Sequence, residues 1–272
     1  MDFPSRVFYF KGSIVTSDYL KRTRSLDEVY AHIDKNRVEA AKIAQARFHN
    51  DMEAAIATIA SIGSIASARV QADSRVASAN VLIDAELAAS RLLAEAEIQA
   101  SNCAKDLLTK PEEVVAAALL EIGKHATQHL VISARESVEK IQRDAETAIK
   151  VLRETSAIAM REVQALADSV TEQTRRDAEL AAAKLAEYRK QSRTLDEAVS
   201  EGEDLAKTVL QAAEEASAQL RSAIETTLNE INTITDNACA AVHEAAAEAK
   251  RKVEEGRERA SLRLKETLKS FM

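Results

Sequence analysis

Two histidines and a glutamate at helical spacing are the residues whose types come nearest to a chemical site. Glu121, His125 and His129 follow one another at intervals of four, so on a helix all three side chains point to one side and could hold a metal ion such as zinc. Such a site needs further ligands from elsewhere, and polar residues near a helix break account for the group as well. We therefore predict no metal and no other cofactor, with these three residues as the weak metal candidate.

Catalytic residues are not indicated elsewhere in the sequence. The five glycines stand singly, so they cannot build a phosphate-binding loop or a nucleophile elbow. The carboxylates stand at helical spacing from basic residues, as Glu254 and Glu258 do near Arg257, which is typical of solvated helix faces. Paired catalytic acids need a cleft that shifts their pKa values, and a thin helical rod offers none. The sequence thus predicts a protein that is not an enzyme.

Charge and hydropathy limit the classes of partner. The formal net charge is -7 at pH 7, and because phosphate binding needs a basic surface, we expect no nucleic acid partner. No apolar run has the length of a membrane span, so we expect none. The first residues lack the basic region and apolar core of a secretory signal, which predicts a cytoplasmic protein.

The elements that carry these residues follow a repeat of eleven. Large residues recur every eleven positions in two stretches, and at about 3.67 residues per turn each row climbs one nearly straight stripe of a helix. The chain is 46% hydrophobic but only 3% aromatic, which indicates a thin, Ala-lined seam in place of a bulky core. We predict an all-α fold, a long Ala-rich hendecad coiled-coil rod, whose oligomerisation seam is formed by Phe48, Ile59, Val70, Val81, Leu92, Cys103, Val209, Leu220, Ile231, Val242, Val253 and Leu264.

Further rows repeat beside this seam. We expect all rows of the first stretch to share one broad helix face. A middle stretch has its own eleven-residue row, with a different phase, at Ala134, Ala145, Ser156, Ala167 and Ala178. The companion rows of the first stretch are Ile65, Val76, Leu87 and Ile98; Ala44, Ala55, Ala66, Ala77 and Ala88; and Met52, Gly63, Ser74, Ala85 and Ala96.

The pattern resembles that of right-handed, eleven-residue coiled-coil proteins in general, as in the peripheral stalk of rotary ATP synthases. The resemblance covers most of residues 37 to 271 and is one of repeat type, with no signature motif. It implies a straight or slightly right-handed coiled coil and a structural role.

Two breaks divide the helical part into three segments. Pro111 is well tolerated in a first helical turn and is followed by acidic residues that suit a helix start. Thr194 to Glu197 repeats the capping box of Ser25 to Glu28. The predicted organisation is therefore a cap over residues 1–24 and three hendecad helices over residues 25–110, 111–192 and 193–272.

The first residues differ from the rest. Aromatic and β-branched residues flank Gly12, which predicts a short N-terminal β-hairpin that either caps the rod or acts in docking and self-assembly. The residues of this assembly hairpin are Phe3, Phe8, Tyr9, Phe10 and Ile14.

Two architectures and three functions follow from these patterns. The three segments either fold back as a bundle or run on as one kinked rod beside other copies, and the scarcity of turn-forming residues favours the rod. The leading hypothesis is a structural protein that associates with itself, or with another helical protein, into a rod, filament or scaffold. The alternatives are a helical coat on lipid or polyester inclusions, similar in composition to phasins, and a spacer or adaptor in a larger complex.

Overall fold

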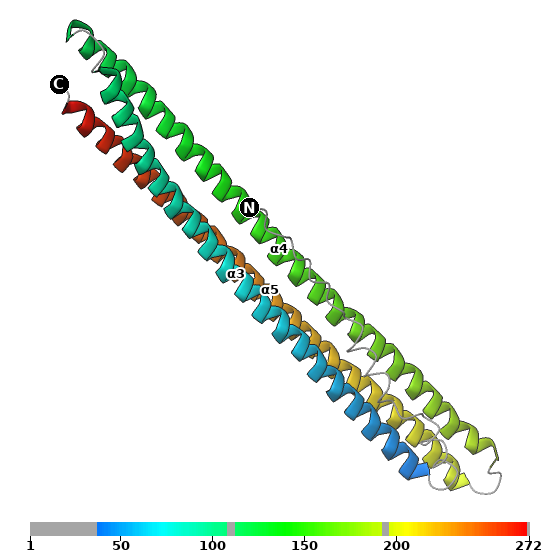
Figure 1. Ribbon diagram of the computed structural model, residues 1–272. Helices are drawn as coiled ribbons and strands as arrows, with labels where there is room; N and C mark the ends of the chain where they lie inside the picture. Colours follow the sequence, from blue (N-terminus) through cyan, green and yellow to red (C-terminus); the bar gives the residue numbers. More distant parts are fainter. Residues whose placement is uncertain (1–36, 108–111, 192–195, 271–272) are drawn as a thin grey trace. The chain divides into compact units, whose positions relative to one another are not determined.

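Three long helices make up the described part of the protein (Figure 1). The computed structural model describes residues 37–107, 112–191 and 196–270. Helix α3 spans Arg37–Leu107, α4 spans Glu112–Gln191 and α5 spans Asp196–Lys269. The hairpin predicted over residues 1–24, with Phe3, Phe8, Tyr9, Phe10 and Ile14, lies outside these ranges. Within them the all-α prediction is confirmed, since every described element is a helix.

Local sequence explains why the helices are so long. Alanine has the highest helix propensity, and neither proline of the chain falls within a described helix. Helix α4 begins directly after Pro111 with two glutamates, and α5 begins with Asp196 and Glu197. Negative side chains in a first turn interact favourably with the positive end of the helix dipole.

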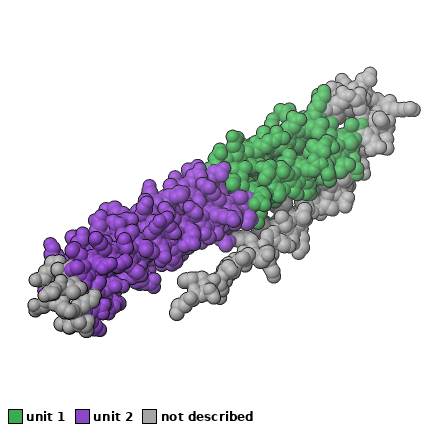
Figure 2. All heavy atoms as spheres, turned by 90° about the horizontal axis from the view of Figure 1, so that it is seen from above, with its two compact units in different colours: residues 1–64, 159–229 green, residues 65–158, 230–272 purple. Residues whose placement is uncertain are grey.

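Two compact units share the three helices, as Figure 2 shows by colour. Unit 1 contains the described residues of 1–64 and 159–229, and unit 2 contains those of 65–158 and 230–272. Each unit therefore receives one stretch of every helix.

Unit 1 is a three-helix bundle in which α4 runs opposite to α3 and α5. One hydrophobic cluster joins Phe48 of α3 to Leu185 of α4 and Val209 of α5. In the next cluster the α3 and α5 members lie further along the chain, whereas the α4 members lie further back, around residues 163–170. The opposite shifts require α4 to be antiparallel to its neighbours.

Unit 2 has the same arrangement, which its side-chain contacts show directly. Lys140 of α4 pairs with Asp84 of α3 at 2.9 Å, and His129 of α4 pairs with Glu95 of α3. From the first pair to the second, the residue number rises by eleven in α3 and falls by eleven in α4. Between α3 and α5 the residue numbers rise together, from the contact of Ser74 with residue 238 to that of residue 86 with residue 252. Helix α3 is therefore antiparallel to α4 and parallel to α5.

The preference for one run-on rod was wrong. Within each unit the three segments pack beside one another, and every core cluster takes residues from all three. Only four residues separate α3 from α4 and α4 from α5, and helix connections of two to eight residues suffice for antiparallel neighbours. The gain from burying three apolar stripes together outweighs the shortage of turn-forming residues.

Candidate interaction surface

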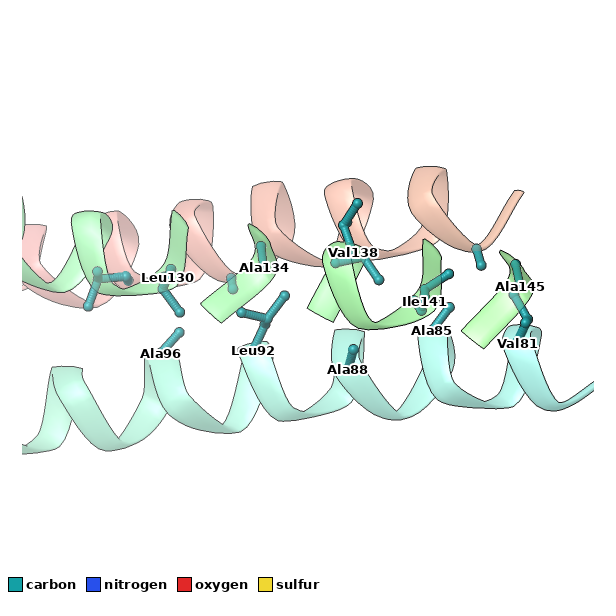
Figure 3. Close-up of a cluster of buried hydrophobic side chains, with 14 of the residues drawn as sticks. Val81, Ala85, Ala88, Leu92, Ala96, Leu130, Ala134, Val138, Ile141 and Ala145 are labelled. Carbon is teal, nitrogen blue, oxygen red and sulfur yellow. The ribbon is translucent and has the colours of Figure 1, made fainter. Parts of the chain in front are cut away.

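The predicted seam lies in the core of the chain's own bundles. All twelve of its residues are at most 4% exposed, and helices of the same chain cover them. Figure 3 shows part of this core, where Ala85 and Leu92 of α3 point toward α4, which carries Ile141. In this fold the seam residues are therefore not available to a second chain.

Small residues set how closely α3 and α5 approach in unit 2. A Cβ atom placed on Gly256 would lie 2.6 Å from the Cβ and 2.8 Å from the Cα of Ala89. Nearby, the buried Ser74 hydroxyl donates a hydrogen bond of 2.9 Å across the interface to the carbonyl oxygen of Ala238. Backbones this close leave room for no larger side chain, as expected for an Ala-lined seam.

The weak metal candidate is not assembled as a site. Glu121, His125 and His129 are all exposed on α4, and His129 contacts Glu95 of α3 through Nδ1. Among the residues that the structure describes, no group of three His, Cys, Asp or Glu side chains is placed to hold a metal ion. Helical spacing put the three side chains on one side, but the packing of α4 brings only Glu95 to one of them, His129, and no group of three ligands results among the described residues.

One half-buried charge cluster lies between α3 and α4 in unit 1. Arg47 and Asp51 approach to 3.5 Å between Nε and Oδ2. Burial raises the pKa of Asp177 above its ordinary value, Arg47 opposes this rise, and Asp51 adds to it. Burial likewise raises the pKa of Asp51, against the effect of Arg47. The Arg47 guanidinium thus lowers the pKa of two carboxyl groups, and its influence on Asp177 of α4 could not be read from sequence spacing within α3.

Charged residues on the two flanks of α3 in unit 2 pair with the neighbouring helices. Asp84 and Glu95 on one flank bond to α4, whereas Glu86 on the other flank bonds to Lys252 of α5 at 2.8 Å. The surfaces of α4 and α5 carry exposed ion pairs of their own, such as that of Arg251 with Glu248 at 2.8 Å. Between its two flanks, α3 presents a surface of another kind.

That surface is an uncharged strip along the outer side of α3. Sequence analysis placed the row beginning at Ile65 on the inner face, and this was wrong. Six residues separate Ile59 from Ile65, which puts the two rows about 130° apart around the helix. The row members Ile65, Val76, Leu87 and Ile98 are 53%, 59%, 46% and 59% exposed. Together with the exposed Ala, Ile and Ser residues of this stretch they form the α3 strip: Ile65, Ala68, Ala72, Val76, Ala79, Ile83, Leu87, Ser90, Ala94, Ile98 and Ser101. The other exposed residues of the stretch are polar or charged and lie beside the strip: Gln71, Arg75, Asn80, Glu86, Arg91 and Glu97.

The signal for this strip was present in the sequence. The angle between rows follows from their offset alone, so the apolar residues of α3 in this stretch must fall on two opposite sides of the helix. Which of the two sides is covered depends on the packing. No described helix is apolar enough over a sufficient length to cross a membrane.

Comparisons with known proteins identify no family for this chain. No family model matches the sequence, and no curated protein matches it. A solved structure described as a computationally designed three helix bundle is similar, with a TM-score of 0.48 and 16% sequence identity. The match covers 86% of this chain and 97% of that chain. Likeness at this level carries no argument about function.

Proposed function

We propose that the protein is a non-enzymatic structural protein that associates with itself into a rod, filament or scaffold. The observation that supports this best is the α3 strip. A helix that is apolar on opposite sides is normally covered on both. The bundle covers the inner side of α3 and leaves the strip outside, where a helix of a second copy would complete the packing.

The composition of the strip favours helix pairing over a lipid surface. Alanine and serine occupy six of its eleven positions, and the other five are Ile, Val or Leu. Small residues let helix backbones approach closely, whereas amphipathic helices that bind lipid present large side chains such as Trp, Phe and Leu. Coating of lipid or polyester inclusions is thus the second candidate, since its motivating feature is the same exposed apolar strip.

Size and shape in solution test the proposal. We expect the molar mass from sedimentation equilibrium to rise with protein concentration, and negative-stain images at high concentration to show assemblies larger than one chain. A compact monomer at every concentration would refute self-association.

A flotation assay separates the second candidate from the first. Purified protein is mixed with vesicles of neutral or anionic phospholipid and centrifuged through a density gradient. We expect the protein to stay at the bottom with both vesicle types. Co-flotation of a chain that is monomeric without lipid would instead support the coating function.

A further inference from the structure

We propose that a second copy of this chain docks on the α3 strip, with the two strips antiparallel about a two-fold axis at Ile83. The inference rests on the proposed self-association and names its site and its partner. All residues of the α3 strip belong to unit 2.

The strip has the spacing of a coiled-coil seam. From Ile65 to Ser101 its members follow at intervals of three, four and four residues, and this order repeats without a break. The same intervals sum to eleven, the period of the rows that pack inside the bundle. No charged residue occupies any of the eleven positions. The outer side of α3 therefore has the same eleven-residue spacing as its inner side.

Side-chain sizes select an antiparallel partner. Turning the strip about Ile83 places Ile65 opposite Ser101 and Val76 opposite Ser90, so that large residues meet small ones. The same operation places Ala68 opposite Ile98 and Ala79 opposite Leu87. At the axis Ile83 meets its own copy, and the remaining pair joins Ala72 to Ala94. A parallel, in-register pair would set each large residue against its own copy and each small residue against a small one, which leaves steric crowding and voids in alternation. A strip that matches its own reverse is what a two-fold interface requires.

The area is sufficient for a specific dimer. Residues 65 to 101 span about 54 Å of helix at about 1.5 Å per residue. With a contact width of about 10 Å, each copy buries about 500 Å², and the pair buries about 1,000 Å². This total lies at the lower limit of specific protein interfaces.

Cysteine cross-linking at the axis tests the register. In an Ile83→Cys variant the two new thiols face each other across the axis, so mild oxidation should link most of the protein into a covalent dimer on a non-reducing gel. The matched control is Ile98→Cys, because both isoleucines are 59% exposed. In the antiparallel pair the two copies of residue 98 lie about 45 Å apart, so this variant should remain uncross-linked. Wild-type protein provides the background, since Cys103 and Cys239 are buried.

A charge on the strip tests the surface independently. Val76→Glu places a carboxylate in the contact twice per dimer and should raise the dissociation constant on the order of a hundredfold. Leu262→Glu on α5 is the matched control, because Val76 and Leu262 are both 59% exposed. It should leave the dissociation constant unchanged. Circular dichroism melts check that both variants keep the wild-type fold.

The outcomes separate this inference from the function on which it rests. A wild-type chain that stays monomeric overturns both. Wild-type association that survives Val76→Glu, or cross-linking of Ile98→Cys as strong as that of Ile83→Cys, overturns the antiparallel strip and leaves self-association standing. Selective cross-linking at residue 83 together with loss of the dimer in Val76→Glu supports the inference.

Discussion

Replacing one glycine of α5 with alanine measures how closely α3 and α5 approach. Gly256 is buried, and a Cβ atom there would lie 2.6 Å from the Cβ and 2.8 Å from the Cα of Ala89. Real Cβ atoms almost never approach other heavy atoms that closely. Because Cα is a backbone atom, one helix must move away from the other in Gly256→Ala.

Two opposing effects set the size of the change. Alanine in place of glycine within a helix stabilises it by about 1 kcal/mol. Overpacking a well-packed interface costs about 1–3 kcal/mol. Since the obstacle is backbone, the cost should lie in the upper part of that range, and we expect Gly256→Ala to lower the free energy of unfolding by about 1–2 kcal/mol.

The matched control is Gly123→Ala in α4 of the same unit. A Cβ atom there meets only the Cδ1 atom of Leu268, at 3.2 Å, and the end of a leucine side chain can shift by a few tenths of an ångström. The helix propensity of alanine should then prevail, and this variant should be more stable than wild type by up to about 1 kcal/mol.

Urea unfolding followed by circular dichroism at 222 nm, the standard helix signal, compares the three proteins. We expect the urea midpoint to fall for Gly256→Ala and to rise for Gly123→Ala. If the Gly256→Ala midpoint rises as much as that of the control, the two backbones are not in close contact and the reasoning is refuted.

The remaining predictions concern polar groups and thiols that are buried or half-buried. Asp177→Asn should raise the thermal midpoint at neutral pH. Burial raises the pKa of Asp177 above its ordinary value of 3.8, so the folded wild type loses stability as the pH rises through the folded pKa. The gain in thermal midpoint should vanish below pH 3.8, where Asp177 is protonated in both the folded and the unfolded protein. Ser74→Ala removes a hydrogen bond of 2.9 Å to α5 and should lower the free energy of unfolding, measured in urea, by about 1 kcal/mol. Ser156→Ala should raise the free energy of unfolding by about 1 kcal/mol, because the buried Ser156 Oγ has no hydrogen-bond partner among the described residues. Cys103 and Cys239 are buried, and burial raises the pKa of the Cys103 thiol. Ellman's reagent should therefore react with both thiols slowly in buffer and rapidly in strong denaturant. Fast reaction in buffer would contradict the burial of the thiols.

Periodicity alone located most of the core. The row from Phe48 to Cys103 and the row from Val209 to Leu264 are buried throughout, as are Ala134, Ala145, Ser156, Ala167 and Ala178 of the middle stretch. A row of large residues at constant helical angle must be covered by something, and the sequence shows that angle directly. The row beginning at Ile65 was misplaced because its angular offset from the Phe48 row was not taken into account.

Contacts between helices were beyond the reach of sequence spacing. Arg47, which lowers the pKa of Asp177, is 130 residues from it in the chain, and the ion pair of Lys252 with Glu86 joins α5 to α3. Glu121, His125 and His129 looked like a group because they share one side of α4, yet His129 contacts Glu95 of α3. Spacing predicts neighbours on one helix, whereas the packing of another helix decides what faces them.

The sequence by itself determined that the chain forms long helices and which residues of each helix are apolar, because helix propensity and angular position are local properties. Only the tertiary structure decided that the helices cover one another within a single chain. It also decided which apolar side of α3 is used. Within each unit the three helices enclose a core, and a helix in such a bundle can turn only one side inward. The seam beginning at Phe48 is therefore interior, and the strip beginning at Ile65 remains on the surface.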